Sequence, residues 1–190
     1  MNIRRITLKI TTAALLTAVG ILIPMFMPPP LKFVIEPMSF TFASHVAVML
    51  AMFLAPDIAA AVAAGTTVGF FLSGLPLMVG LRAASQIIFV MLGAFYIQRR
   101  PAVLGDTWKM RLFSLILGVI HAAAEVAVVT FFYFSGKVAG SFVYSVLLLV
   151  GIGTLVHSMV DFEIAYWITK AFRGPARLRR MVCGERKEKS

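Results

Sequence analysis

Six apolar segments, most of them close to the length of a membrane-spanning helix, divide this chain of 190 residues. A helix needs about 20 apolar residues to cross the hydrocarbon core of a bilayer. The composition agrees, because 60% of the residues are hydrophobic, only 14% are charged and the mean hydropathy is +0.92. We therefore expect an all-α integral membrane protein, folded as a compact bundle of six transmembrane helices. The predicted segments are Ile10–Met27, Phe40–Leu54, Ile58–Leu72, Leu75–Ile97, Leu112–Phe134 and Val143–Thr169.

The distribution of basic residues predicts the orientation of this bundle. Cytoplasmic loops of membrane proteins are enriched in Lys and Arg. With the N-terminus inside, the outer loops carry only Lys32 and Lys137, so both termini are expected in the cytoplasm. Residues 1–172 then form the transmembrane domain and residues 173–190 a basic cytoplasmic tail. The inner segments carry Arg4, Arg5, Lys9, Arg99, Arg100, Lys109, Arg111 and that tail.

The net charge of +10 comes largely from the end of the last apolar segment and from this tail. Basic clusters beside a membrane helix contact anionic lipids. No nucleic-acid recognition module accompanies them, so nucleic-acid binding is not expected. The single Cys183 provides neither a disulfide nor a cysteine metal site. The sequence also lacks a phosphate-binding Gly-rich loop with Lys, a His-Glu-x-x-His pair and a Gly-x-Ser-x-Gly elbow, so we do not expect an enzyme.

Arg82 lies inside the fourth apolar segment, where a charge is costly. A guanidinium keeps its charge, and placing it at bilayer depth costs about 2.5–3.5 kcal/mol on insertion scales. Gln86 follows four residues later, on the same helical face. His121 and Glu125 repeat this spacing in the fifth segment. Ionisable residues within membrane segments indicate a functional site, or pairs that hold helices together.

Counting the helical rise along each segment places these polar residues by depth. Arg82, Gln86, Glu125, His121 and His45 fall at similar levels toward the outer face, where they can line one outward cavity. In contrast, Asp161 and Glu163 approach the cytoplasmic end of their helix, and a structural role or a partner contact is predicted for His157, Asp161 and Glu163.

Arg82 has two interpretations. It forms an internal ion pair with Glu125 and binds no ligand, or it clamps a small carboxylate through its planar donor geometry. In the second case Gln86 or His121 reads another polar group, and aromatic residues including Tyr133 pack against a flat ring. The loop from Pro28 to Ser39, which contains Lys32 and Glu36, is either a surface connector or a lid over the cavity.

Two pairs of small residues occur at helical spacing: Ala14 with Ala18, and Gly65 with Gly69. Such pairs allow close approach of helices, either within the bundle or against another membrane subunit.

These features together resemble the S components of energy-coupling factor (ECF) vitamin transporters. The resemblance extends from Ile6 to Phe172, and it is carried by the runs Ala14–Phe26, Glu36–His45 and Ala64–Phe71. It implies capture of a vitamin near the external face, gated by the first outer loop. It also implies partners, a transmembrane coupling subunit and two ATPase subunits, with Ala14 and Ala18 on the surface that meets the coupling subunit.

The region around Arg82 and the Ser44-His45 run are most similar to the niacin-specific branch, although pantothenate and riboflavin remain alternatives. A structural or regulatory membrane protein is a second hypothesis, and an enzyme using His121 and Glu125 as acid and base is a third.

No cofactor is expected. The chain begins Met1-Asn2, without the Met-His pair of metal-specific relatives, so no metal is expected either. We expect location in a prokaryotic plasma membrane. The expected substrate-binding residues are Arg82, Gln86, Glu125, His121, His45, Glu36 and Tyr133.

Overall fold

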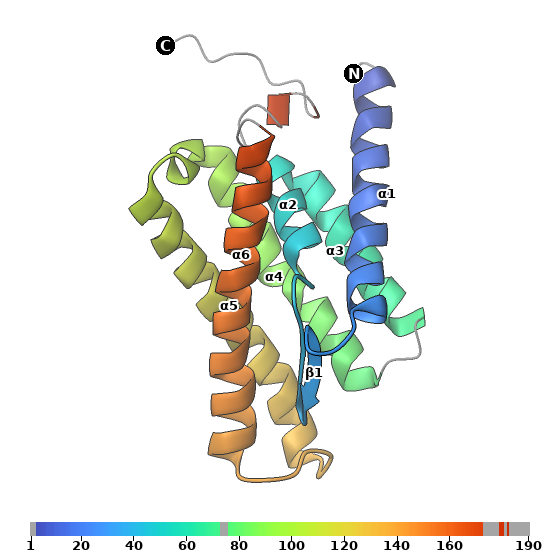
Figure 1. Cartoon of the computed structure of the whole chain (residues 1–190), viewed down its shortest axis with the longest axis vertical. Coiled ribbons are helices and arrows are strands. Elements are labelled where there is room, and N and C mark those ends of the chain that lie inside the picture. Colours follow the sequence, from blue (N-terminus) through green and yellow to red (C-terminus); the bar gives the residue numbers. More distant parts are fainter. Residues whose placement is uncertain (1–2, 73–75, 173–178, 181, 183–190) are drawn as a thin grey trace.

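A computed structural model describes residues 3–72, 76–172, 179–180 and 182 of the chain. Its helices lie side by side along the long axis, and a small β-hairpin is tucked between them (Figure 1). Within the described residues, four helical stretches are long and apolar enough to cross a membrane: Ile3–Phe26, Leu77–Arg99, Thr107–Phe134 and Val143–Ala171. The elements are α1 (Ile3–Phe26), β1 (Lys32–Ile35), β2 (Met38–Thr41), α2 (Val46–Leu54), α3 (Pro56–Leu72), α4 (Leu77–Arg99), η1 (Pro101–Leu104), α5 (Thr107–Phe134), η2 (Val143–Ile152) and α6 (Gly153–Ala171).

The start of α1 and the end of α6 lie at the same end of the bundle (Figure 1). This arrangement agrees with termini on one side of a membrane. The turn between α4 and α5 also lies at this end, and α5 begins there because the Asp106 carboxylate caps it, accepting hydrogen bonds from the backbone N–H groups of Trp108 and Lys109. The hydrogen bond from Lys109 is the main cause that holds the pKa of Asp106 below its ordinary value.

The second predicted segment differs from the structure. Only Val46–Leu54 is helical there, and a helix of 9 residues rises about 14 Å, less than half of the hydrocarbon core. The predicted helical bundle also contains a short β-hairpin that was not expected, in which β1 and β2 pair antiparallel, with Lys32 opposite Thr41. The β-branched and aromatic residues of these segments favour strands, and the rings of Phe33 and Phe40 stack across the hairpin at 4.9 Å between centroids.

The short helix α2 forms the centre of the core. Its sequence is apolar on every side, which is typical of a helix surrounded by protein. Eight of its residues are buried. Neighbouring buried residues of α3, α4, α5 and α6 pack into the same cluster, among them Ile58, Phe89, Phe113 and Phe162. The core therefore surrounds α2, and the hairpin that precedes it is held next to the polar interior.

Helix α1 packs against α3 over a narrow strip of small residues. A Cβ atom added at Gly65 would lie 2.7 Å from Thr17 Cγ2, and one added at Gly69 would collide with Ile21. The Gly65/Gly69 pair therefore serves packing within the bundle. Ala14 and Ala18, on the other hand, are exposed on α1, as are Leu15, Val19 and Leu22.

Gly65→Ala is expected to destabilise the protein by about 1–3 kcal/mol, the usual cost of overpacking. Thr17 is β-branched and has few alternative rotamers, so it cannot turn away from the added methyl group. Adding Thr17→Ala should recover most of the loss. Gly105→Ala is the matched control, because its Cβ would meet only Ala102 O at 3.5 Å. Thermal unfolding in detergent measures the effect, and unchanged stability in Gly65→Ala would contradict the close packing of α1 on α3.

Candidate functional site

Arg82 and Glu125 form a buried ion pair between α4 and α5. The Nε and Nη2 atoms of Arg82 donate to Glu125 Oε2 at 3.1 and 2.7 Å. Thr154 Oγ1, on α6, donates to the same oxygen at 2.6 Å. Arg82 is 6% exposed and Glu125 is 4% exposed. The costly charge of Arg82 is therefore compensated inside the protein, as the ion-pair interpretation predicted.

The β-hairpin covers this ion pair. Arg82 Nη1 donates to the backbone carbonyl of Pro37 at 3.2 Å, and Arg82 Nη2 lies 3.3 Å from Met38 Sδ. Lys32 Nζ, on β1, donates to the carbonyl of Pro24 in α1 at 2.7 Å. The first long loop is thus an ordered wall over the site, with contacts to α1 and α4, and more than a surface connector.

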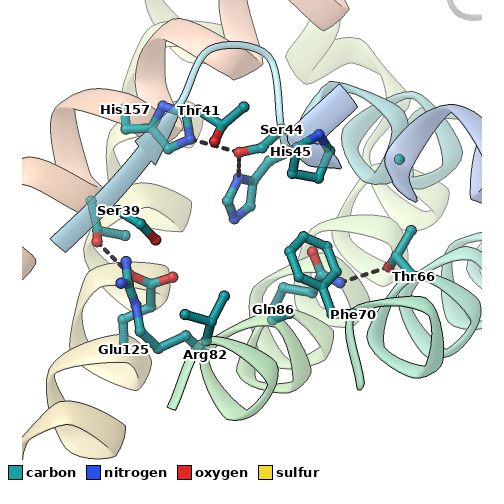
Figure 2. Close-up of a pocket in the computed structure, with 15 residues that line it drawn as sticks. Ser39, Thr41, Ser44, His45, Thr66, Phe70, Arg82, Gln86, Glu125 and His157 are labelled. Carbon is teal, nitrogen blue, oxygen red and sulfur yellow. Dashed lines mark hydrogen bonds and ion pairs between the residues drawn. The ribbon is translucent and has the colours of Figure 1, made fainter. Parts of the chain in front are cut away.

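A polar cavity with a volume of about 70 Å³ lies beside the ion pair. That space can hold a few water-sized groups. Figure 2 shows its polar side chains facing one another, with His45, Ser44 and His157 on one side and Arg82, Glu125 and Gln86 on the other. The remaining lining residues are Gly20, Pro24, Ser39, Thr41, Thr66, Phe70, Val79, Ala83 and Thr154.

Gln86 is held in place at the cavity wall by α3. Its Nε2 donates to Thr66 Oγ1 at 2.8 Å and approaches the carbonyl of Ala63 at 3.5 Å. Thr66 in turn donates to carbonyls of its own helix. Gln86 can therefore present its amide to a ligand in one fixed orientation.

The three histidines meet at one side of this cavity. The ring of His45 lies 4.6 Å from that of His121 and 5.1 Å from that of His157, between centroids. Ser44 Oγ is within hydrogen-bonding distance of both His45 Nδ1, at 3.0 Å, and His157 Nε2, at 2.9 Å. His121 lies behind, fully buried against Phe89 at 4.3 Å between ring centroids.

His157 was expected to have a structural role or to contact a partner, but it lines the cavity together with His45. Asp161, one turn further along α6, holds the chain between β2 and α2. Its Oδ1 accepts from the N–H of Ala43 at 3.0 Å, and its Oδ2 from the N–H of His45 at 2.8 Å. This is the structural role expected for Asp161, and it fixes the backbone that presents His45.

Three of the expected binding residues, His121, Glu36 and Tyr133, do not line the cavity. Glu36 is exposed at the turn between β1 and β2. The hydroxyl of Tyr133 donates to the carbonyl of Gly140 at 3.2 Å, and its ring packs on Phe142 at 5.3 Å between centroids. Glu163 lies apart from the cluster, with Oε1 at 3.7 Å from Arg111 Nε.

Sequence reasoning missed the hydroxyl groups of the cavity. Ser44, Thr66 and Thr154 each hydrogen-bond to one of the expected residues. Ser and Thr are common in membrane helices, where they also bond to the backbone of their own helix. A single hydroxyl in an apolar segment therefore gives no signal by itself.

Fold and site together define a membrane-embedded helical bundle that encloses a polar cavity for a small molecule. A scan against protein-family models gives no match, and no solved structure matches the chain. The niacin transporter NiaX of Lactococcus lactis subsp. cremoris (strain MG1363) is 44% identical over 155 residues, which cover 80% of this chain and 69% of that protein. The chain belongs to the family of this transporter, the niacin branch of S components. It is thus a non-catalytic transport protein that passes several times through a bacterial cell membrane.

Proposed function

We propose that the protein captures niacin in the cavity beside Arg82, as the substrate-binding S component of an ECF importer. The observation that carries this proposal is a buried guanidinium at the wall of a small polar cavity. Niacin is a carboxylate on a pyridine ring. Its carboxylate would accept a charge-assisted hydrogen bond from Arg82, because Glu125, Pro37 and Met38 use four of its five N–H donors.

The remaining polar groups of the proposed site would orient the pyridine ring. The amide of Gln86 and the hydroxyl of Ser44 would contact the ring from opposite sides of the cavity, and His45 lies beside Ser44 on the same cavity. Glu125 would hold Arg82 in place through their ion pair, and the ring of His121 would pack against that of His45. We propose no vitamin contact for Glu36 or Tyr133, because neither lines the cavity. Since the hairpin contacts Arg82 directly, its displacement would open the site, and the positive-inside pattern would orient this end outward.

Nicotinate is expected to raise the thermal stability of the purified protein, because a ligand that binds only the folded state stabilises it by about 2.7 kcal/mol at 100 times its Kd. Nicotinamide is the matched control ligand, since it keeps the ring but lacks the negative charge. It should bind at least about tenfold more weakly if a charge-assisted hydrogen bond is lost. Stabilisation by pantothenate or riboflavin but not by nicotinate would reassign the substrate. If none of the three binds, the importer proposal fails.

The exposed face of α1 is our proposed contact with a transmembrane coupling subunit, which would connect the S component to two ATPase subunits. Ala14 and Ala18 are both exposed there, with apolar neighbours that include Leu15 and Val19. Small residues let a second helix approach closely. The chain has no nucleotide-binding motif of its own, so ATP hydrolysis would come from the partners.

Ala14→Trp and Ala18→Trp should abolish co-purification with the coupling subunit and reduce vitamin uptake by at least about tenfold, because a large ring prevents close helix contact. Nicotinate binding should stay within about twofold of wild type, since neither residue lines the cavity. Val156→Trp, on the exposed face of α6, is the matched control and should leave both unchanged. Equal loss of uptake in all three variants would argue against an interface on α1.

A further inference from the structure

All three histidines of the chain gather in one cluster with two carboxylates. Two groups of three side chains there have potential metal-ligating atoms within 4.8 Å of one another. The first is His45, His121 and Glu125; the second is His45, His157 and Asp161. In each group the two residues other than His45 are buried. Such a concentration of ligand atoms inside an apolar bundle is costly unless each atom has a partner.

In the second group most ligand atoms have protein hydrogen bonds, although the buried His157 Nδ1 has no partner among the described residues. Both oxygens of Asp161 accept backbone N–H groups, from Ala43 and His45. His157 Nε2 pairs with Ser44 Oγ at 2.9 Å. These contacts account for the group as a structural network.

The first group leaves two ligand atoms facing each other. His121 is fully buried, and its Nε2 has no hydrogen-bond partner among the described residues. This nitrogen lies 3.5 Å from Glu125 Oε1. Among the described residues, the hydrogen bonds that Glu125 accepts from Arg82 and Thr154 all reach the other oxygen, Oε2.

The other atoms of these rings are held by neighbours. His121 Nδ1 lies 3.4 Å from Ser158 Oγ, which orients the ring in the way that second-shell groups orient metal-bound histidines. His45 Nδ1 pairs with Ser44 Oγ, so Nε2 is the nitrogen left for a shared ligand. Bonds of about 2.0–2.1 Å to nitrogen and oxygen would join two atoms 3.5 Å apart at close to a tetrahedral angle.

We propose that His45, His121 and Glu125 bind a divalent transition-metal ion of the Zn²⁺ class. Two imidazoles and one carboxylate favour such an ion over Mg²⁺ or Ca²⁺. His45 and Glu125 both line the cavity, so the fourth coordination position faces it. Three protein ligands with one open position are typical of zinc sites that bind a further molecule.

The charges of the cluster agree with this assignment. With neutral imidazoles, it contains one guanidinium, Arg82, and two carboxylates, Glu125 and Asp161. A divalent ion leaves one net positive charge, which a single carboxylate ligand balances. Balancing this charge with the vitamin carboxylate rests on the proposed function. The metal site itself is independent of the proposed function.

The test is titration of Co²⁺ into untagged, chelator-treated full-length protein in detergent, followed by visible absorption and metal analysis. One equivalent should bind, with a four- or five-coordinate spectrum. His121→Asn should weaken binding by at least about tenfold, whereas His157→Asn and Cys183→Ser should retain it. Absence of Co²⁺ binding in the wild type, or equal binding in His121→Asn, overturns the site. If His121→Asn does not fold, X-ray absorption of the wild-type complex decides, with two imidazole ligands expected and a thiolate or all-oxygen shell contradicting the assignment.

Nicotinate binding measured with and without the metal separates this site from the proposed function. Removal of the ion should weaken nicotinate binding by at least about tenfold, because the open position and its charge are lost. Unchanged nicotinate binding after removal would overturn the role of the ion in vitamin binding while leaving the proposed function intact. If the protein binds Co²⁺ but nicotinate binds neither the metal-free nor the metal-loaded form, the proposed function is overturned instead.

Discussion

Arg82→Gln is expected to abolish nicotinate binding and to lower the free energy of unfolding by about 3–5 kcal/mol, the usual cost of removing one partner of a buried ion pair. The variant leaves the Glu125 carboxylate buried, with Thr154 as its remaining short hydrogen bond. Loss of one charge-assisted hydrogen bond to the vitamin corresponds to at least about tenfold in affinity. Isothermal titration and thermal unfolding in detergent measure the two effects.

A double-mutant cycle with Glu125→Gln separates stability from binding. Each single variant leaves one uncompensated charge, whereas Arg82→Gln/Glu125→Gln leaves none, so the double variant should be more stable than either single variant. It should still fail to bind nicotinate. Arg111→Gln is the matched control, because the Arg111 side chain is 61% exposed and its loss should cost no more than about 0.5 kcal/mol. Full nicotinate affinity in Arg82→Gln would disprove the carboxylate clamp.

Asp161→Ala should destabilise the protein by about 3 kcal/mol or more, because it strands two backbone N–H groups that a buried charged acceptor now satisfies. Asp161 is fully buried and joins α6 to the chain before α2. One of the two N–H groups belongs to Ala43, which has a φ of 63°, a left-handed conformation that non-glycine residues rarely adopt. The carboxylate therefore holds a strained segment in place.

Nicotinate binding should weaken in the same variant, since Ser44 and His45 line the cavity directly beyond that segment. Glu163→Gln, two residues along the same helix, is the matched control. Its ion pair with Arg111 is long and partly exposed, so stability should change by no more than about 0.5 kcal/mol. If both variants unfold at the same temperature, Asp161 does not anchor the hairpin connection.

The apolar segments were predicted well because a membrane helix is specified by local sequence. Every backbone polar group in lipid must be satisfied within the helix, so a long apolar run has few alternatives. The fourth and fifth segments, Leu75–Ile97 and Leu112–Phe134, correspond closely to α4 and α5. Residues 32–45 were harder, since a short apolar stretch is compatible with a strand or a helix until its neighbours are known.

The sequence by itself determined that the chain is a helical membrane protein with a costly charge at Arg82, because composition and length are properties of the chain alone. It also gave Arg82 two possible counter-charges, a ligand or Glu125. Only the tertiary structure showed the ion pair of Arg82 with Glu125, the position of His157 at the cavity wall and the hairpin that covers the site. Depth counted along one helix gives no information on how neighbouring helices are offset or rotated. That arrangement depends on contacts between residues far apart in sequence, such as Asp161 with Ala43 and Gly65 with Thr17.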